Sequence, residues 1–414
     1  MLAAIARTLP ATRHRDFRAL WGGSACSSIS LWTLLLGNGY IVHKLSGSSF
    51  WVGVSTFASM SPYLIAPLGG VIADRVERRY LVRVTRLATF GVTMTLFALA
   101  FSGVLEVWMV VGMALAQGLV RSVEIPADQS LLPNVVPMEH RANAVALQSM
   151  SQQGSRAIGA LVSAPLLLTV GVEGAYAVSA VFALLAFTSV SQVRVSSRGG
   201  VVRLGDVVEN LRDGFTDVRS NGPVLAVFAL VFAHCSLTMS FDAMLPGFAE
   251  DQLHKPAGGL TMMSFGVGIG ALIGTFALAV MTGARGRLLL ITGLASGISP
   301  MLMAISMRME PAAVSAILMG SSQAMFMALS AVLLQEVVPD EIRGRVMSLY
   351  LMSAGGIMAI MNLGFGTLAD RWGTTVLFAT PGAVFVVVVL ASTVTGPHLR
   401  RVYRTGTMRV EAAA

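Results

Sequence analysis

The sequence predicts an all-α membrane protein whose chain crosses the bilayer twelve times, in two related halves of six helices. Three observations support this fold class. Hydrophobic residues make up 55% of the 414 residues and charged residues only 12%. Apolar segments of about 20 residues, the length that crosses a ~30 Å hydrocarbon core, recur along the whole chain. A loop motif also repeats at about half the chain length, and the arginines gather in alternate loops.

The composition excludes several other classes. Soluble domains contain about 25% charged residues, so this chain has too few polar groups to cover a water-exposed surface. The net charge of +8 does not indicate nucleic-acid binding, because the basic residues form short clusters between apolar runs. Cys26 and Cys235 both fall in apolar segments, which predicts neither a disulfide framework nor a metal site. We therefore expect no metal, no cofactor and no nucleic-acid partner, and the first span itself serves as the insertion signal.

Twelve segments qualify as spans, and each should be a helix because a segment in lipid must satisfy its own backbone hydrogen bonds. We expect them at 19–43, 50–73, 80–102, 106–127, 142–170, 173–193, 222–248, 258–282, 288–308, 311–335, 344–369 and 374–396.

The distribution of basic residues predicts the orientation. With the N-terminus in the cytoplasm, the cytoplasmic pieces contain 24 Lys and Arg residues and the outer loops contain four, while Arg156 remains inside a span. Because positive residues are retained on the cytoplasmic side, both termini are expected there.

An internal repeat divides the chain. The sequence VVPMEHR at 135–141 returns as VVPDEIR at 337–343, an offset of 202 residues, in each case before the fifth span of a half. This predicts an N-terminal six-helix bundle at 1–193 and a C-terminal one at 222–414. The linker at 194–221 has apolar residues at helical spacing opposite acidic ones, which predicts an amphipathic helix on the cytoplasmic membrane surface.

The loop after the second span, GGVIADRVERR at 69–79, resembles the signature loop of the major facilitator superfamily. A weaker echo, GTLADRWG at 366–373, follows the eleventh span. The resemblance covers span count, half repeat, linker and loop position. It implies the major facilitator fold of two pseudo-symmetric bundles, with transport by alternating access.

The resemblance also implies roles for residues of this loop. A glycine at 70 lets two helices approach closely, and Asp74 faces the positive N-terminus of a neighbouring helix. Arg75, Arg78 and Arg79 would pair with acids at the ends of other spans and hold the cytoplasmic gate shut. The alternative is that these arginines only follow the positive-inside rule.

Other stretches refine the resemblance. Glu77 replaces the family's glycine, as in the enterobactin-exporter-like subgroup. The motif of drug–proton antiporters on the fourth span is partly present: Gln117 and Gly118 match, but Ala114 stands where a basic residue is usual. The fifth-span antiporter motif is degraded at 159–164. Export of a drug against protons is thus an extension of the resemblance.

Ionisable residues inside spans are costly, about 2.5–3.5 kcal/mol each at mid-bilayer, so each requires a reason. Arg156 either binds an anionic substrate group or a carboxylate, or forms a structural ion pair with Glu124. Arg121, Glu124 and Asp128 share a helix face. They form either a solvated charge ladder near the interface or, through Glu124, a proton-coupling site.

The second half offers fewer candidates. Asp242, the one acid well inside its spans, is either a titratable coupling or cation-binding group or a water-exposed acid. His234 lies two helical turns earlier and either shares that face or packs in the bundle. Gln117, Gln153 and Gln323 either line the cavity or form interhelical hydrogen bonds.

The run GVGIGA at 266–271 has the form of a dinucleotide-binding fingerprint but lies inside a span with no strand before it. Gly266, Gly270 and Gly274 instead predict a seam for close helix contact. With no phosphate loop, metal cluster or nucleophile–base set in the sequence, we do not expect an enzyme.

We therefore expect a monomeric secondary transporter of a bacterial inner membrane, exporting a small amphipathic molecule such as a siderophore or drug. The absence of a nucleotide motif favours an ion gradient, that of protons, as the driving force. An importer of a small polar metabolite, or a receptor or scaffold that retains the fold, is the alternative.

Overall fold

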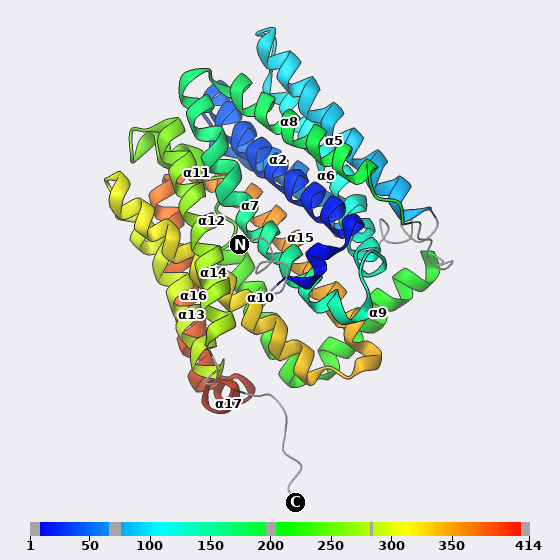
Figure 1. Ribbon diagram of the computed structural model, residues 1–414. Helices are drawn as coiled ribbons and strands as arrows, with labels where there is room; N and C mark the ends of the chain where they lie inside the picture. The colour runs from blue at the N-terminus through cyan, green and yellow to red at the C-terminus, as the bar shows by residue number, and fades with distance from the viewer. Residues whose placement is uncertain (1–8, 66–75, 196–203, 282–284, 407–414) are drawn as a thin grey trace, which may run out of the picture. The chain divides into compact units, whose positions relative to one another are not determined.

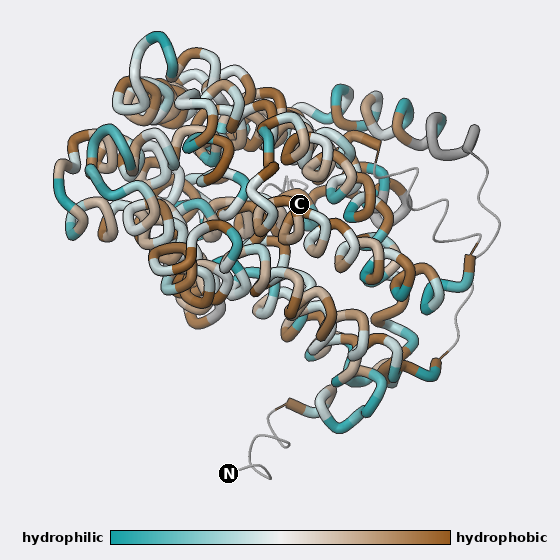
Figure 2. The backbone as a smooth tube through the Cα atoms, turned by 90° about the horizontal axis from the view of Figure 1, so that it is seen from above, coloured by the Kyte–Doolittle hydropathy of each residue, from teal (hydrophilic) through white to brown (hydrophobic). Residues whose placement is uncertain are grey.

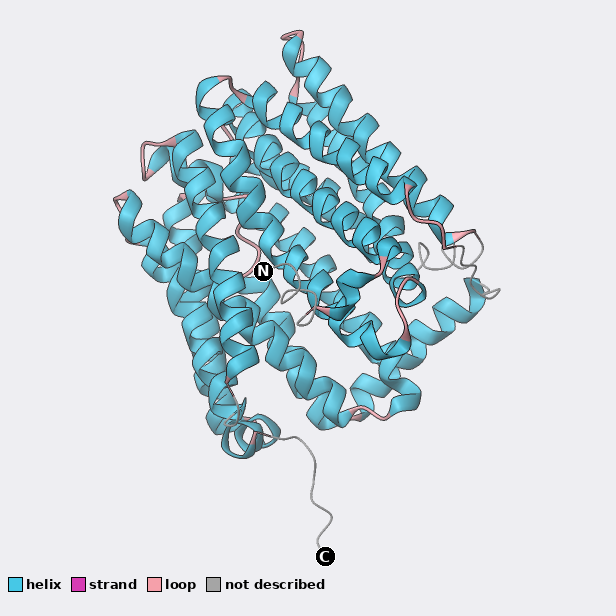
Figure 3. Cartoon of the chain, viewed as in Figure 1, coloured by secondary structure: helices cyan, strands magenta, loops and turns pink. Residues whose placement is uncertain are grey.

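The computed structural model describes residues 9–65, 76–195, 204–281 and 285–406, and every regular element in these ranges is a helix (Figure 3). Apolar residues run along the helices, and hydrophilic residues gather at many of the connections (Figure 2). The described chain forms two compact units. The first contains residues from 1–47 and 58–204, and the second residues from 48–57 and 205–414.

The first unit is built around the long helix α2 (Arg15–Ser46), which packs against α6, α7 and α8 (Figure 1). Its other elements are η1 (Pro10–Arg13), η2 (Ser61–Ile65), α5 (Arg78–Phe101), α6 (Val107–Leu131), η3 (Leu132–Asn134), η4 (Met138–His140), α7 (Arg141–Thr169) and α8 (Val172–Ser191). Buried apolar side chains, among them Phe17, Leu20 and Leu131, close one end of this bundle. These contacts fix α2 and α6 side by side, which positions the site described below.

The second unit contains the helices that follow residue 203. They are α9 (Leu204–Ser220), α10 (Gly222–Leu237), α11 (Leu245–Asp251), α12 (Pro256–Val280), α13 (Arg285–Ala304), α14 (Met309–Val337), α15 (Asp340–Trp372), α16 (Thr374–Thr395) and α17 (Pro397–Thr405). The predicted glycine seam is confirmed, because α12 lies directly against α14. A Cβ at Gly266 would meet the Ala316 side chain at 2.8 Å, and one at Gly270 would overlap the Ile317 carbonyl.

Helix α3 (Ser49–Met60) contributes to both units. Its first part lies on α15, where a Cβ at Gly53 would stand 2.8 Å from the Asn362 carbonyl oxygen. Its last turn lies on α6, where a Cβ at Gly118 would overlap the Ser59 carbonyl. Glycines at both crossings allow backbone-to-backbone packing.

The internal repeat corresponds to the same local structure in both copies. Pro137 (φ −60°, ψ 158°) is the N-cap of η4, which leads into α7, and Pro339 (φ −54°, ψ 150°) is the N-cap of α15. The proline fixes φ and lacks an N–H, so it suits the start of a helix. The repeat therefore marks equivalent helix entries in the two halves.

Nine helices of the described chain are long and apolar enough to span a membrane, or ten when the bent pair α9–α10 is counted. They match nine of the predicted spans. The other three, 50–73, 142–170 and 222–248, differ for separate reasons. The first is described only to residue 65. Helix α7 covers the second but carries many glutamines and serines, and the third is broken between α10 and α11.

Helix α9 covers residues 204–220 of the predicted linker and packs against other helices of the second unit. A Cβ at Gly214 would lie 3.0 Å from the Leu349 side chain, so α9 lies close to α15. The Arg345 guanidinium pairs with Asp213 at 3.4 Å and lies 3.9 Å from Asp217. Helix α9 therefore has a docking position on protein, in addition to any contact with lipid.

The last helix, α17, closes one end of the second unit. Leu399, Val402 and Tyr403 are buried, and Arg400 donates to the Thr393 and Val394 carbonyls at the end of α16. Burial raises the pKa of the Tyr403 phenol, which shares a hydrogen bond with a serine of α16.

Candidate functional site

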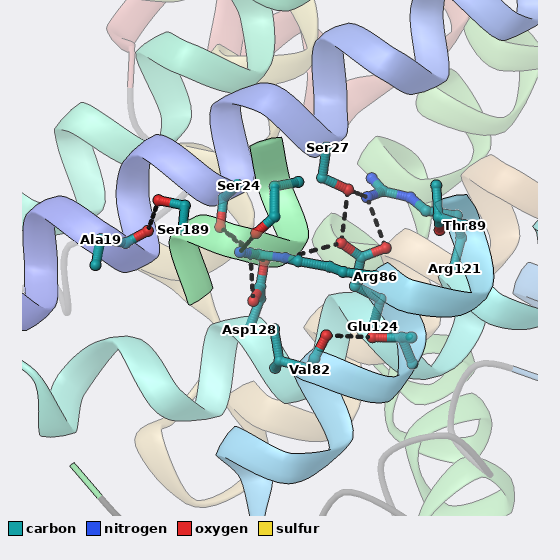
Figure 4. A network of polar contacts seen from close by, with 12 residues as sticks. Ala19, Ser24, Ser27, Val82, Arg86, Thr89, Arg121, Glu124, Asp128 and Ser189 are labelled. Atoms are coloured by element: carbon teal, nitrogen blue, oxygen red, sulfur yellow. Dashed lines mark hydrogen bonds and ion pairs between the residues drawn. The ribbon is translucent and has the colours of Figure 1, made fainter. Parts of the chain in front are cut away.

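Four charged side chains meet inside the first unit, where α2, α5 and α6 come together (Figure 4). Arg86 comes from α5, and Arg121, Glu124 and Asp128 come from successive turns of α6. We call these four residues the charge cluster.

The ion pairs of the charge cluster are short and shielded from solvent. Arg86 Nη2 lies 3.0 Å from Asp128 Oδ2, and Arg86 Nε lies 3.6 Å from Glu124 Oε1. Arg121 Nη1 approaches Glu124 Oε2 at 3.3 Å. The Arg86 and Glu124 side chains are 0% and 1% exposed, and those of Asp128 and Arg121 each 12%. The predicted solvated charge ladder is therefore wrong for these residues, because neighbouring helices cover them.

Hydroxyl groups of α2 complete the coordination of the carboxylates. Ser27 Oγ donates to Glu124 Oε1 at 2.7 Å, and Ser24 Oγ donates to Asp128 Oδ2 at 2.8 Å. Arg86 donates to Ser24 Oγ at 2.8 Å as well. Charges buried away from water are stable only when they are paired and their remaining hydrogen-bonding capacity is satisfied. Ser24 and Ser27, on the third helix α2, provide these additional hydrogen bonds to the carboxylates.

The local sequence explains why these groups converge. Positions 121, 124 and 128 are spaced by three and four residues and therefore share one face of α6. Gly23 on α2 leaves the room that the Arg86 guanidinium occupies, since a Cβ there would overlap it. Arg86 also reaches the Ala186 carbonyl of α8 at 3.4 Å. One arginine of α5 thus contacts three other helices.

The charge balance of the cluster gives it a chemical capacity. With both carboxylates ionised, two negative and two positive groups cancel. A proton added to either carboxylate leaves one guanidinium charge uncompensated in a low-dielectric environment, where an unpaired charge is costly. Protonation here is consequently linked to the packing of α5 and α6 against α2.

Gln117 lies one turn before the cluster on α6, is buried, and donates to Thr89 Oγ1 of α5 at 3.3 Å. This is the interhelical hydrogen bond expected of a membrane glutamine.

Arg78 and Arg79 of the signature loop lie in the first turn of α5. Arg78 donates to the Ser130 carbonyl at 3.3 Å. Arg79 pairs with Glu77 at 2.9 Å and donates to the Arg194 carbonyl at 3.0 Å. Gly70, Asp74 and Arg75 lie outside the described residues.

Arg156 has a different environment from the one expected for a pair with Glu124. Its guanidinium carbon lies 4.6 Å from the centre of the Trp32 ring, a cation–π contact between α7 and α2. Glu124 pairs with the arginines of the charge cluster instead. Gln153, one turn earlier on α7, is exposed on the unit's surface.

The candidates of the second half gather around the break between α10 and α11. Asp242 lies in the non-helical segment 238–244 and is half-buried. Gln323 of α14 donates to the Thr238 carbonyl at 2.7 Å. His234 is fully buried and shares a hydrogen bond of 2.8 Å with Ser296. Its ring stacks on Phe326 of α14 and meets Phe385 of α16 edge-on. This environment matches the packing alternative for His234.

Sequence reasoning missed Arg86. Arg86 lies inside the predicted span 80–102 but follows a run of arginines in the preceding loop. It is therefore grouped with the cytoplasmic basic residues when the orientation is predicted. The signal was its position, eight residues into the helix, where a charge requires a partner. No group of three or more His, Cys, Asp or Glu side chains suited to a metal occurs in the described ranges.

Solved structures share this fold. A peptide transporter of the POT family in complex with alafosfalin superposes with a TM-score of 0.76 at 13% identity, covering 94% of this chain and 95% of that one. The nucleoside transporter NupG gives a TM-score of 0.69 at 14% identity, covering 91% and 98%. These likenesses show that the chain has the fold of the major facilitator superfamily.

Comparison with protein families assigns the chain to a narrower group than its fold alone. The family model described as transmembrane secretion effector matches residues 6–402, and the chain belongs to that family. Macrolide efflux protein A of Streptococcus pyogenes is 24% identical over 390 residues, covering 90% of this chain and 94% of the relative. The staphyloferrin A transporter of Staphylococcus aureus is 25% identical over 138 residues, 33% of this chain and 35% of the relative. The chain is a secondary transporter, not an enzyme.

Proposed function

We propose that this protein exports a small amphipathic molecule, a drug or a siderophore, across a bacterial inner membrane in exchange for protons. The observation that carries the proposal is the charge cluster of Arg86, Arg121, Glu124 and Asp128. A relative named as a macrolide efflux protein supports the direction, and this relative and one named as a staphyloferrin transporter support the class of substrate. We also propose that both termini are cytoplasmic, on the distribution of 24 against four basic residues.

Proton coupling requires a group whose charge changes the stability of one helix arrangement relative to another. Glu124 meets this requirement, because it joins an arginine of α5, an arginine of its own helix and a serine of α2. Neutralising Glu124 weakens all three contacts at once. Proton binding would therefore favour an arrangement in which these helices separate, and release of the proton would restore the packed one.

The proposal is tested with inside-out vesicles or proteoliposomes and a panel of fluorescent amphipathic compounds. Wild-type protein should accumulate at least one compound against its gradient when the pH gradient is imposed, and nigericin should abolish the accumulation. Transport that is indifferent to the pH gradient would remove proton coupling.

The Glu124→Gln variant should lose gradient-driven accumulation by about tenfold or more while still catalysing downhill flux, since a fixed neutral group cannot report the proton gradient. Glu106→Gln is the matched control, because Glu106 lies at the start of the same helix and is exposed. It should behave as wild type.

A further inference from the structure

Helix α17 packs on the ends of α13 and α16 and has two unlike faces (Figure 1). The buried face consists of apolar and aromatic side chains, namely Leu399, Val402 and Tyr403. The opposite face is exposed and basic, and it consists of Arg400, Arg401 and Arg404. Because the apolar face packs on protein, the helix holds its arginines at a defined place on the surface of the second unit.

The first turn of α13 extends this basic face. A Cβ at Gly286 would overlap the Val402 carbonyl, and one at Gly406 would lie 3.8 Å from Arg285 Cβ, so the two helices touch backbone to backbone. Arg287 follows the crossing directly and is exposed. We use the name basic surface for four arginines, Arg287, Arg400, Arg401 and Arg404.

The protein leaves most of the charge on the basic surface without a carboxylate partner. Arg285, which lies beside it, is paired with Glu336 of α14. Arg400 is anchored by two backbone carbonyl groups at the end of α16. In the part of the chain that the structure describes, the other three arginines of the surface form no ion pair. Such a surface favours an anionic partner, and guanidinium groups match the oxygens of a phosphate.

The neighbouring side chains indicate which anion this is. On α13, exposed apolar residues continue the helix face that begins with Arg287, and they are Ile291, Ile298, Leu302 and Ile305. On α16, a second set of exposed apolar residues runs towards the carbonyl groups that anchor Arg400, and they are Val387, Leu390 and Val394. Both helices are long and apolar enough to span a membrane, so these residues face acyl chains. The arginines therefore lie at the depth of the lipid headgroups.

From this arrangement we propose that the basic surface binds the phosphate headgroups of anionic phospholipids, whose acyl chains lie along the exposed apolar faces of α13 and α16. A lipid held in this way contacts both the arginines and the helix faces next to them. A soluble anion would use the arginines alone. The inference is independent of the transported molecule and of the coupling ion.

The experiment titrates lipid onto the full-length protein in a neutral detergent and measures the affinity for the first bound lipid by native mass spectrometry. The probes are phosphatidylglycerol and phosphatidylcholine with the same acyl chains. Wild type should prefer phosphatidylglycerol. The double variant Arg401→Gln/Arg404→Gln should weaken that binding by about tenfold or more and leave phosphatidylcholine binding unchanged. The variant Arg401→Lys/Arg404→Lys should retain most of the affinity, because it keeps both charges.

A second measurement uses the melting temperature, since a ligand that binds the folded protein stabilises it. Phosphatidylglycerol should raise the melting temperature of wild type more than phosphatidylcholine does, and this difference should disappear in Arg401→Gln/Arg404→Gln. The melting temperature of that variant without added lipid should stay close to that of wild type, because both side chains are exposed.

Arg308→Gln/Arg371→Gln is the matched control, because both arginines are exposed, belong to the second unit and remove the same charge. It should bind phosphatidylglycerol as wild type does. An equal loss of affinity in the control would show that the lipid responds to net charge, and would overturn the inference. Unchanged phosphatidylglycerol affinity in Arg401→Gln/Arg404→Gln would also overturn it. Displacement of the lipid by an equal concentration of inorganic phosphate would reassign the surface to soluble anions.

Discussion

The carboxylate of Asp370, in the last turn of α15, lies over the first turn of α3 and accepts from the backbone N–H of Ser49. Oδ1 is 2.7 Å from the Ser49 nitrogen, Oδ2 is 3.2 Å from the Phe50 nitrogen, and the Ser48 hydroxyl donates to the same group. A negative charge at a helix N-terminus satisfies free N–H groups and opposes the positive end of the helix dipole. The contact also explains the echo of the signature loop. Gly366 lets α15 approach the Ser49 carbonyl, and Asp370, one turn later, caps α3.

Removing this cap should loosen the start of α3. The Asp370→Ala variant is expected to destabilise the α3–α15 contact by about 0.5–2 kcal/mol, and Asp370→Asn by less, since asparagine keeps an acceptor oxygen. The reporter is maleimide labelling of a cysteine at Val52, which is 1% exposed, in a protein whose native cysteines are replaced by serine. Labelling should accelerate several-fold with Asp370→Ala. An unchanged rate would show that the glycine crossing alone holds α3.

Arg86 should be the most important residue of the charge cluster for stability. Replacing it with glutamine leaves Asp128 and Glu124 buried with one arginine between them, which we expect to lower the free energy of unfolding by about 3–5 kcal/mol. Adding Asp128→Asn to this variant should recover part of the loss, because one uncompensated charge is removed. Thermal unfolding in mild detergent measures both.

Arg83→Gln is the control for this prediction. Arg83 lies three residues earlier on α5, is half-buried, and donates to the Ser191 and Val193 carbonyls. Its replacement should change the melting temperature little. A loss as large as that of Arg86→Gln would mean that any arginine of α5 contributes equally.

The glycine seam of α12 predicts a contrast within one helix. Gly270→Ala places a methyl group against the Ile317 carbonyl, whereas Gly258→Ala meets nothing within 4 Å. Overpacking of this kind costs about 1–3 kcal/mol. Gly270→Ala should therefore lower the melting temperature and the yield of folded protein, while Gly258→Ala should raise stability slightly or leave it unchanged. The reverse order would contradict the packing of α12 on α14.

The docking of the linker helix should depend on packing more than on charge. Gly214→Val forces a side chain against Leu349 and should release α9, whereas Arg345→Ala removes partly exposed ion pairs worth at most about 1 kcal/mol. Limited proteolysis of residues 204–220 reports the release. Faster cleavage is expected for Gly214→Val only, and faster cleavage of Arg345→Ala alone would assign the docking to the salt bridges.

The sequence predicts features that depend on local pattern. Helical spans follow from hydropathy, the Pro137 and Pro339 helix entries from the repeat, and the α12–α14 seam from glycine spacing. Features that depend on contacts between residues far apart in the sequence could not be predicted from local pattern. The break at 238–244 is held by Gln323 and Asn362, which lie 85 and 119 residues from the groups they bind. Hydropathy records composition and cannot distinguish an interrupted span from a continuous one.

The charge cluster shows the same limit. Spacing on α6 identified Arg121, Glu124 and Asp128 as one face, but their burial depends on α2 and α5. Arg86 could be recognised as their partner only once α5 was placed beside α6.

The capping of α3 by α15 constrains how the protein is made. Ser49 and Asp370 are separated by 321 positions, so the ribosome releases the first segment long before the residue that holds it. Until α15 has entered the membrane, the contacts that Ser49 and Gly53 make with α15 cannot form. Assembly of the second unit is therefore completed late in synthesis, and chains truncated before residue 370 should remain substrates for membrane proteases.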